Sequence, residues 1–482
     1  MQSDIDELYR RGVRLTPEAY GYIEKNPVEP ALLERIAASG EMLLAKEAID
    51  GFLVGEEKIP VQTVVSRSPT FKPIAREYAP SLRVVEKSDV SGKSDCTGKL
   101  DDFVGHFRNR FKRISGVLRA RPSQHTVVGT GNLKPAQGGR LRLIAMVAER
   151  KTTKKGNLFF DVEDEEGSAK VVVPKDTTAF RLASRAQNDD IIAFDGKAVD
   201  ELFICDNVEW PDISVAREAK RVENDIAIAY LSDLHMGSKK FMEKEFAQFV
   251  SWLNGSEGRQ ELAGKVKYIM IAGDIVDGIG IYPSQEKELA VNDIYKQYEM
   301  FDSALEKLPD YITVVVGPGN HDAVRRAEPQ PIIPYDMLKG NVVRVGSPAR
   351  IEVEGLMHLM YHGTSLDSII AGMSGLSYNK PEEAMLELVK RRHLSPIYGD
   401  NLIVPESHDF LVMDEEPDVV HMGHVHKNGQ MIYRGARLIN SGTFQERTDF
   451  QVRMGHHPSP GIVSVLEAKA GKMHNIGFNA AT

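Results

Sequence analysis

The sequence predicts a multidomain chain of class α/β plus β, with a layered α/β domain, a small β-barrel and an N-terminal helical bundle. Three observations support this. After about residue 222, short apolar runs alternate with helical segments, which is typical of a sheet covered by helices. Residues 126–215 contain strand candidates separated by Gly, Asp and Lys turns, as in a closed barrel of the oligonucleotide-binding (OB) type. A length of 482 residues leaves room for about two to four domains.

Residues 1–57 are expected to form the helical module. Thr16 followed by Pro17 is typical of an N-cap and the first residue of a helix. Such a module either binds a partner or is an appendage with no defined role. Residues 58–100 carry Pro, Ser, Lys and Asp with little periodicity, which predicts a flexible and partly disordered linker.

Residues 101–221 are expected to form the barrel domain with a leading helix. Apolar side chains recur at spacings of three and four from Val104 to Leu118, and basic side chains that include Arg110 take the opposite face. That basic face either contacts a phosphate backbone or is the solvated side of a packed helix. A basic loop at 150–156 precedes two phenylalanines, so single-strand binding and protein docking both remain open for the barrel.

Bulk composition excludes several classes. A formal charge of −9 argues against a generally basic nucleic-acid coat. The two cysteines, Cys96 and Cys205, exclude a disulfide scaffold and a thiolate zinc site. We find no apolar run long enough to span a membrane and no secretory leader, so a soluble cytoplasmic protein is expected.

Residues 222–482 contain five apolar runs, each typical of a buried strand, that end on a side chain able to bind a metal. Because α/β sheets place ligand sites at strand ends, these side chains are expected to converge. The predicted metal ligands are Asp233, His235, Asp274, Asn320, His362, His424 and His426.

This set of oxygen and imidazole donors suits two divalent cations that act on a phosphate ester. Asp274 is the natural bridge between them, and two ligand carboxylates leave the site positive toward an anionic substrate. Manganese is the expected metal, with iron or zinc as alternatives. His321 is predicted to protonate the leaving oxygen, with Asp322 or Asp277 as the residue that orients it.

Five short motifs resemble those of the calcineurin-like metallophosphoesterases. They are DLH at 233–235, GDIVDG at 273–278, GNHD at 319–322, HG at 362–363 and GHVH at 423–426. The resemblance implies a four-layer α/β sandwich of sheets over residues 222–482. Gly278 and Asp322 depart from the protein phosphatases of that superfamily, which favours its nuclease branch.

Two further stretches, 278–299 and 390–400, and the barrel ahead of the phosphoesterase domain are similar to the small subunits of archaeal family D DNA polymerases. This resemblance implies a 3′–5′ exodeoxyribonuclease that proofreads in an archaeal cell, and its catalytic positions carry over to the seven metal ligands and His321. The implied partners are a large polymerase subunit, DNA 3′ ends and, through the assembled enzyme, a sliding clamp. A vestigial scaffold subunit and a phosphodiesterase of small substrates are the alternatives.

Overall fold

The computed structural model describes residues 71–133, 139–256 and 258–478, together with residues 5, 9–10, 13–25 and 43–44. The chain divides into two compact units, Met1–Val64 and Val65–Thr482. The first contains α2 (Pro17–Lys25) and two paired short strands, β1 (Arg14–Leu15) and β2 (Leu43–Leu44). The hydroxyl of Thr16 accepts a hydrogen bond from the amide of Ala19 at 3.3 Å, as predicted for an N-cap. The other helices expected in residues 1–57 lie outside the described residues.

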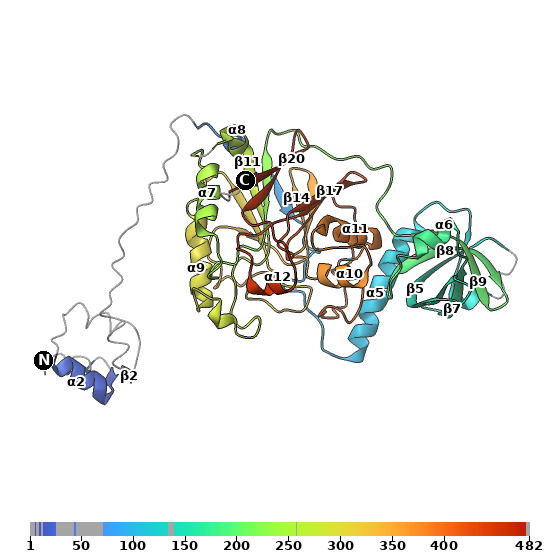
Figure 1. Ribbon diagram of the computed structural model, residues 1–482, viewed down its shortest axis with the longest axis horizontal. Helices are drawn as coiled ribbons and strands as arrows, with labels where there is room; N and C mark the ends of the chain where they lie inside the picture. The colour runs from blue at the N-terminus through green and yellow to red at the C-terminus, as the bar shows by residue number, and fades with distance from the viewer. Residues whose placement is uncertain are drawn as a thin grey trace. The chain divides into compact units, whose positions relative to one another are not determined.

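Two six-stranded mixed sheets form the centre of the second unit (Figure 1). In order, the first contains β13 (Val343–Arg344), β12 (Thr313–Gly317), β11 (Val266–Ala272), β10 (Ala227–Leu231), β19 (Ile462–Glu467) and β20 (Lys472–Gly477). The second contains β17 (Gly429–Tyr433), β18 (Ala436–Asn440), β16 (Val419–Met422), β15 (Leu356–Met360), β14 (Ala349–Val353) and β3 (Leu82–Val84). The five apolar runs are β10, β11, β12, β15 and β16, so they are strands as predicted. They belong to two sheets, however, and not to one central sheet.

Helices cover the outer faces of the two sheets (Figure 1). Those against the first sheet are α7 (Glu243–Leu253), α8 (Gln260–Lys265) and α9 (Ile294–Leu305), and those against the second are α10 (Leu366–Gly372) and α11 (Pro381–Arg391). The remaining short helices of this part are η1 (Ile74–Glu77), η3 (Gln285–Lys287) and α12 (Asp449–Arg453). Among the described residues, no helix is long and apolar enough to cross a membrane.

The alternation of side chains along β10 explains the layering. Ile228 and Tyr230 pack between the two sheets, whereas Ala229 and Leu231 pack beneath the helices of the first sheet. A strand buried on both faces needs a continuous apolar run, which is what the sequence provides. The result is a helix–sheet–sheet–helix sandwich, as the resemblance to the metallophosphoesterases implies.

Residues 71–100 correct the prediction of a flexible linker over 58–100. Strand β3 pairs with β14 at the edge of the second sheet. Farther along, the carboxylate of Glu406 accepts hydrogen bonds from the amides of Asp95 (2.7 Å) and Cys96 (3.0 Å). The segment is polar because it lies on the surface of a preformed domain, which supplies partners for its backbone groups. Residues 58–70 lie outside the described residues.

The sequence also predicts a last pair of strands at residues 434–444 and 461–468, and this pairing needs correction. Residues 434–444 and 461–468 do contain β18 and β19, but these strands do not pair with each other. β18 lies between β16 and β17 in the second sheet, and β19 lies between β10 and β20 in the first. An apolar pattern identifies a strand without identifying its partner.

A β-barrel with a small helix forms the remaining domain. Its strands are β4 (Thr126–Val128), β5 (Leu141–Thr152), β6 (Leu158–Asp164), β7 (Gly167–Val173), β9 (Leu202–Glu209) and β8 (Ile191–Val199) in sheet order, and β5 also pairs with β8. The helix α6 (Thr178–Ala183) follows β7, and the short η2 (Thr130–Asn132) follows β4. Of the two adjacent phenylalanines, Phe160 is in the barrel core and Phe159 is only half-buried.

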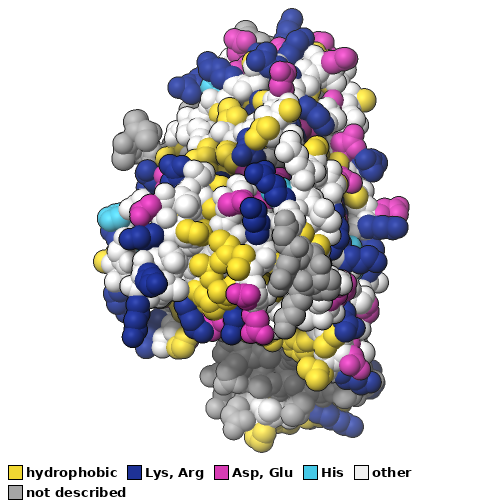
Figure 2. Space-filling model, turned by 90° about the vertical axis from the view of Figure 1, so that its right-hand side faces the viewer, with side chains coloured by type: hydrophobic (Ala, Val, Ile, Leu, Met, Phe, Trp, Pro, Cys, Tyr) yellow, Lys and Arg dark blue, Asp and Glu magenta, His cyan; other side chains and the backbone are white. Residues whose placement is uncertain are grey.

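Helix α5 (Leu100–Arg119) packs against both the barrel and the layered α/β domain, and its basic face is not simply solvated. Arg110 is 1% exposed and donates to the carboxylate of Asp409 at 2.7 Å. Near the barrel, Arg391 of α11 pairs with Asp190 at 2.9 Å. On the face shown in Figure 2, Lys and Arg side chains are interspersed with Asp and Glu around a group of apolar side chains.

Candidate metal centre

The seven predicted ligands follow the ends of five strands. β10, β11 and β12 are parallel neighbours, so the loops after them leave the same edge of the first sheet. β15 and β16 are parallel neighbours in the second sheet and deliver the remaining three histidines in the same way. The two sheets pack face to face, which brings both groups of loops together.

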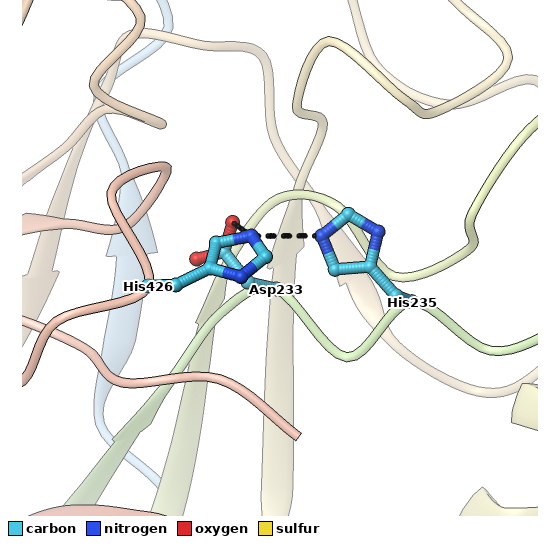
Figure 3. Close-up of side chains that lie close together, drawn as sticks. All are labelled: Asp233, His235 and His426. Atoms are coloured by element: carbon cyan, nitrogen blue, oxygen red, sulfur yellow. Dashed lines mark hydrogen bonds and ion pairs between the residues drawn. The ribbon is translucent and has the colours of Figure 1, made fainter. Parts of the chain in front are cut away.

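One group of donors consists of Asp233, His235 and His426 (Figure 3). The Nε2 atoms of His235 and His426 face each other at 3.0 Å, and Nε2 of His426 lies 3.4 Å from a carboxylate oxygen of Asp233. All three side chains are buried. Two imidazole nitrogens and a carboxylate that converge in this way could hold one divalent cation.

A second group consists of Asp274, Asn320, His362 and His424. Nε2 of His362 lies 3.3 Å from a carboxylate oxygen of Asp274 and 3.0 Å from the amide oxygen of Asn320. Nδ1 of His424 lies 3.1 Å from the same amide oxygen. All seven predicted ligands are therefore in one cluster, which we call the donor cluster.

Asp274 connects the two groups. The same carboxylate oxygen that lies near His362 is 3.8 Å from Nε2 of His235. Asp274 and Asp233 can also supply donor atoms within 4.8 Å of each other, together with His362. This central position is the one predicted for a carboxylate that bridges two cations.

The backbone around the donor cluster is strained. Asp233, His235, Asp274, His424 and His426 all have positive φ angles, between 52° and 71°. Side chains other than glycine rarely adopt this region, and such strain is concentrated at functional sites. At Gly273 the φ angle is +88°, and a Cβ atom there would lie 2.7 Å from Nδ1 of His362. Only glycine allows the backbone beside Asp274 to come this close.

Hydrogen bonds fix the ring orientation of the four histidines. Nδ1 of His235 lies 3.0 Å from the carboxylate of Asp277, and Nδ1 of His362 lies 2.7 Å from the carbonyl oxygen of Ala272. On the other side, Nε2 of His424 lies 2.9 Å from the carboxylate of Asp367. The amide group of Gln451, on α12, lies 2.9 Å from Nδ1 of His426. Each ring thus keeps its other nitrogen directed into the cluster.

His321 borders the donor cluster, and the structure identifies the group that orients it. Its Nδ1 lies 2.7 Å from the backbone carbonyl oxygen of Asp277, and its Nε2 lies 4.0 Å from Asp274. Asp322 instead accepts hydrogen bonds from the amides of Asp274 and Gly319, both at 2.8 Å, and from the hydroxyl of Tyr298 at 3.0 Å. Asp322 is therefore placed to hold two ligand loops together and does not contact His321 through its side chain.

The donor cluster fits a pair of divalent cations. Within the described ranges, neither Asp233 nor Asp274 has a Lys or Arg as an ion-pair partner, although both carboxylates are buried. Burial lowers the pKa of His362, but the charge of Asp274 outweighs it and raises the pKa to about 10. The pKa of His235 is raised as well, because bonding to Asp277 and the charges of Asp274 and Asp277 outweigh burial. The same negative field favours a bound cation.

Several other histidines are core residues with hydrogen-bond partners. Nε2 of His358 bonds with the hydroxyl of Tyr230 at 2.9 Å, and Nε2 of His393 bonds with Asp409 at 2.9 Å. His456 is different, because its ring lies 4.1 Å from that of Tyr378, which hydrogen-bonds to Asp367. It therefore borders the donor cluster.

Sequence reasoning missed Asp367 and Gln451. Asp367 lies five residues after His362, and Gln451 lies in a segment with no metal-binding motif. Their roles depend on which histidine each one meets in the folded chain. Only the proximity of Asp367 to the His-Gly motif could have identified it beforehand.

The fold and the donor cluster define the class of this domain: residues 226–428 match the Calcineurin-like phosphoesterase family. The DNA polymerase II small subunit of Archaeoglobus fulgidus is 37% identical over 466 residues, which cover 94% of this chain and 93% of that protein. The protein of the same description from Methanothermobacter thermautotrophicus is 34% identical and covers 98% of this chain and 99% of its own length. The small subunit from Methanocaldococcus jannaschii is 40% identical, over 83% of this chain and 69% of that protein. The chain belongs to the family of archaeal DNA polymerase II small subunits, which confirms the resemblance to family D small subunits.

Proposed function

We propose that this chain is the 3′–5′ exodeoxyribonuclease subunit of a two-subunit DNA polymerase. The observation that supports this most strongly is the convergence of all seven predicted donors, with Asp274 at the centre and His321 beside it. The description of its relatives as small subunits supports a large subunit as the partner. A sliding clamp would be reached through the assembled enzyme.

We propose specific roles for the residues of the site. Asp233, His235, Asp274 and His426 would hold one cation, and Asp274, Asn320, His362 and His424 would hold the other. When bound, two divalent cations, which we propose to be manganese, act as Lewis acids on the phosphodiester. His321 would exchange a proton through Nε2 with the 3′ oxygen that leaves, because its Nδ1 is committed to the carbonyl of Asp277. Asp322 would keep the loops of Asp274 and Gly319 at a fixed separation.

Two variants test this function. Asn320→Ala removes a proposed ligand and His321→Ala removes the proposed proton donor. We expect His321→Ala to slow digestion of a mismatched 3′ end by about 10²- to 10⁴-fold with manganese, and Asn320→Ala to abolish it, while both chains keep their circular-dichroism spectrum. The matched control is His474→Gln. His474 lies on the edge strand β20, away from the donor cluster, where it pairs with Glu467, and this variant should retain activity. Digestion that persists in both variants would contradict the proposal, as would a wild-type complex that digests no DNA end.

We further propose that the barrel is of the OB type. Its closing order β5-β6-β7-β9-β8, with α6 between β7 and β8, supports this assignment. The division into a helical module at 1–57, a barrel domain at 101–221 and a phosphoesterase domain at 222–482 is part of the same proposal.

A further inference from the structure

The segment after Asp277 turns closely over His321. Gly278 has a φ of +75°, and a Cβ atom there would collide with the carbonyl oxygen of His321. The segment that follows therefore begins against the residue proposed to exchange the proton. It belongs to the stretch 278–299, for which the donor cluster itself gives no role.

Hydrogen bonds from two sides fix this turn. The amide nitrogen of the fully buried Gln285 side chain donates to the carbonyl oxygen of Asp277 at 2.7 Å, and its oxygen accepts from the amide of Ile281 at 2.9 Å. From the other side, the guanidinium of Arg326 donates to the carbonyl oxygens of Gly280 at 3.0 Å and Ile281 at 2.7 Å. The turn is held in one conformation although it lies at the surface.

The fixed turn exposes apolar side chains next to the donor cluster. Ile279 is 44% exposed and Tyr282 is 39% exposed. The ring of Tyr282 lies 6.3 Å from the ring of His321, at 61° to it. An exposed aromatic ring on a rigid turn, in contact distance of the reacting region, has the properties of a stacking platform.

We propose that Tyr282 stacks on the terminal nucleobase of an unpaired DNA 3′ end and so sets the position of the scissile phosphodiester relative to His321. This inference rests on the proposed function and adds a specificity-determining residue to it. A paired 3′-terminal base must first be unpaired before it can turn onto Tyr282, whereas a frayed or mismatched base is free to do so. The platform therefore favours frayed or mismatched ends, and it tolerates all four bases because each offers a π face.

The inference is tested on the assembled two-subunit enzyme by combining a substitution in the protein with a change in the DNA substrate. The substrates are two single strands that differ only at the 3′ nucleotide, which is either normal or abasic. We expect Tyr282→Ala to reduce kcat/KM by about tenfold or more on the normal end and to have little effect on the abasic end. Tyr282→Phe should behave like the wild type. Tyr295→Ala, which removes a 50% exposed tyrosine of α9, is the control.

A binding measurement separates this inference from the proposed function. In the His321→Ala background, the fluorescence of a 2-aminopurine at the 3′ terminus should be quenched when the strand binds. Adding Tyr282→Ala should abolish this quenching. The stacking role would be overturned if Tyr282→Ala reduced kcat/KM equally on the normal and the abasic end, or if it left the quenching unchanged. If the wild type digests neither end while quenching still depends on Tyr282, the nuclease proposal fails and the stacking site stands. If quenching is also absent, both fail.

Discussion

In each histidine of the donor cluster, the ring nitrogen that faces away from the cluster forms a hydrogen bond with a different part of the chain. His235 meets the carboxylate of Asp277, which lies in the same GDIVDG motif as Asp274. His424 meets Asp367, at the start of α10 in the second sheet's helical layer. Such outer partners fix the tautomer and the direction of a ligand ring, and a carboxylate also increases its basicity. The cluster is therefore held by groups that the five motifs only partly contain.

Asp367 allows a test of this support, because its side chain is about half exposed and its loss should cost little stability. We expect Asp367→Ala to weaken binding of the second cation by about 10- to 100-fold, since His424 would lose its orienting bond. Competition with a metal-sensitive dye would measure the change as manganese is added. The control is Glu383→Ala, which removes a carboxylate of α11 that pairs with Lys380 just before the helix. If the wild type, Asp367→Ala and Glu383→Ala all bound manganese with the same affinity, His424 would be oriented without Asp367.

At the scale of elements, α5 depends on a buried ion cluster. Arg110 and His393 both contact the carboxylate of Asp409, at 2.7 and 2.9 Å, and none of the three is exposed. Burial raises the pKa of Asp409, but the charge of Arg110 and bonding with His393 outweigh it and hold the pKa well below its usual range. This carboxylate joins the helix of the barrel domain to the phosphoesterase domain.

The sign of the pH dependence follows from that shift. A carboxyl whose folded-state pKa is depressed stabilises the fold fully above its unfolded pKa of about 4, and loses this contribution as the pH falls through the folded value. We expect Asp409→Asn to lower the free energy of unfolding by about 3–5 kcal/mol at neutral pH, and the deficit to shrink below about pH 4. Urea unfolding across this range would measure it.

The control for this variant is Arg108→Ala, on the exposed side of α5, which should change stability by less than about 0.5 kcal/mol. A deficit of Asp409→Asn that stayed constant from neutral pH to about pH 3 would indicate lost packing and not lost charge.

The elements also show what the sequence can and cannot predict. The strands around the motifs were predictable, because runs buried on both faces are continuously apolar. Their division between two sheets followed only from the family resemblance and not from the apolar pattern, because strand pairing is a tertiary property. For the same reason β18 and β19 have different neighbours than the predicted strand pair implied. Arg110 looked solvated because its partner Asp409 is about 300 residues away in the chain. The seven donors were identifiable because each directly follows a strand, whereas Asp367 and Gln451 do not.

At the scale of the whole molecule, net charge limits the affinity that the isolated chain would have for DNA under the proposed function. The formal charge is −9 over 482 residues, and Figure 2 shows basic and acidic side chains mixed on the barrel side. Arginines that looked available for phosphate, such as Arg110 and Arg113, are committed to Asp409 and Asp414 within the chain. If the chain acts on DNA as proposed, the phosphate contacts that dominate affinity would come mainly from another subunit.

We therefore expect the isolated chain to bind a single-stranded 3′ end weakly at physiological salt, with a Kd of about 10⁻⁶ M or weaker, in the range of non-specific binding. Because few counterions are released, its affinity should also depend only weakly on salt, and adding the large subunit should both tighten binding and steepen that dependence. Fluorescence anisotropy of a labelled strand between about 50 and 200 mM salt measures both quantities, with the His321→Ala variant used to prevent digestion. Nanomolar affinity of the chain alone, with a steep salt dependence, would show that its own surface recruits the substrate. Delivery of the 3′ end by the large subunit would then no longer be needed to explain how the proposed nuclease reaches DNA.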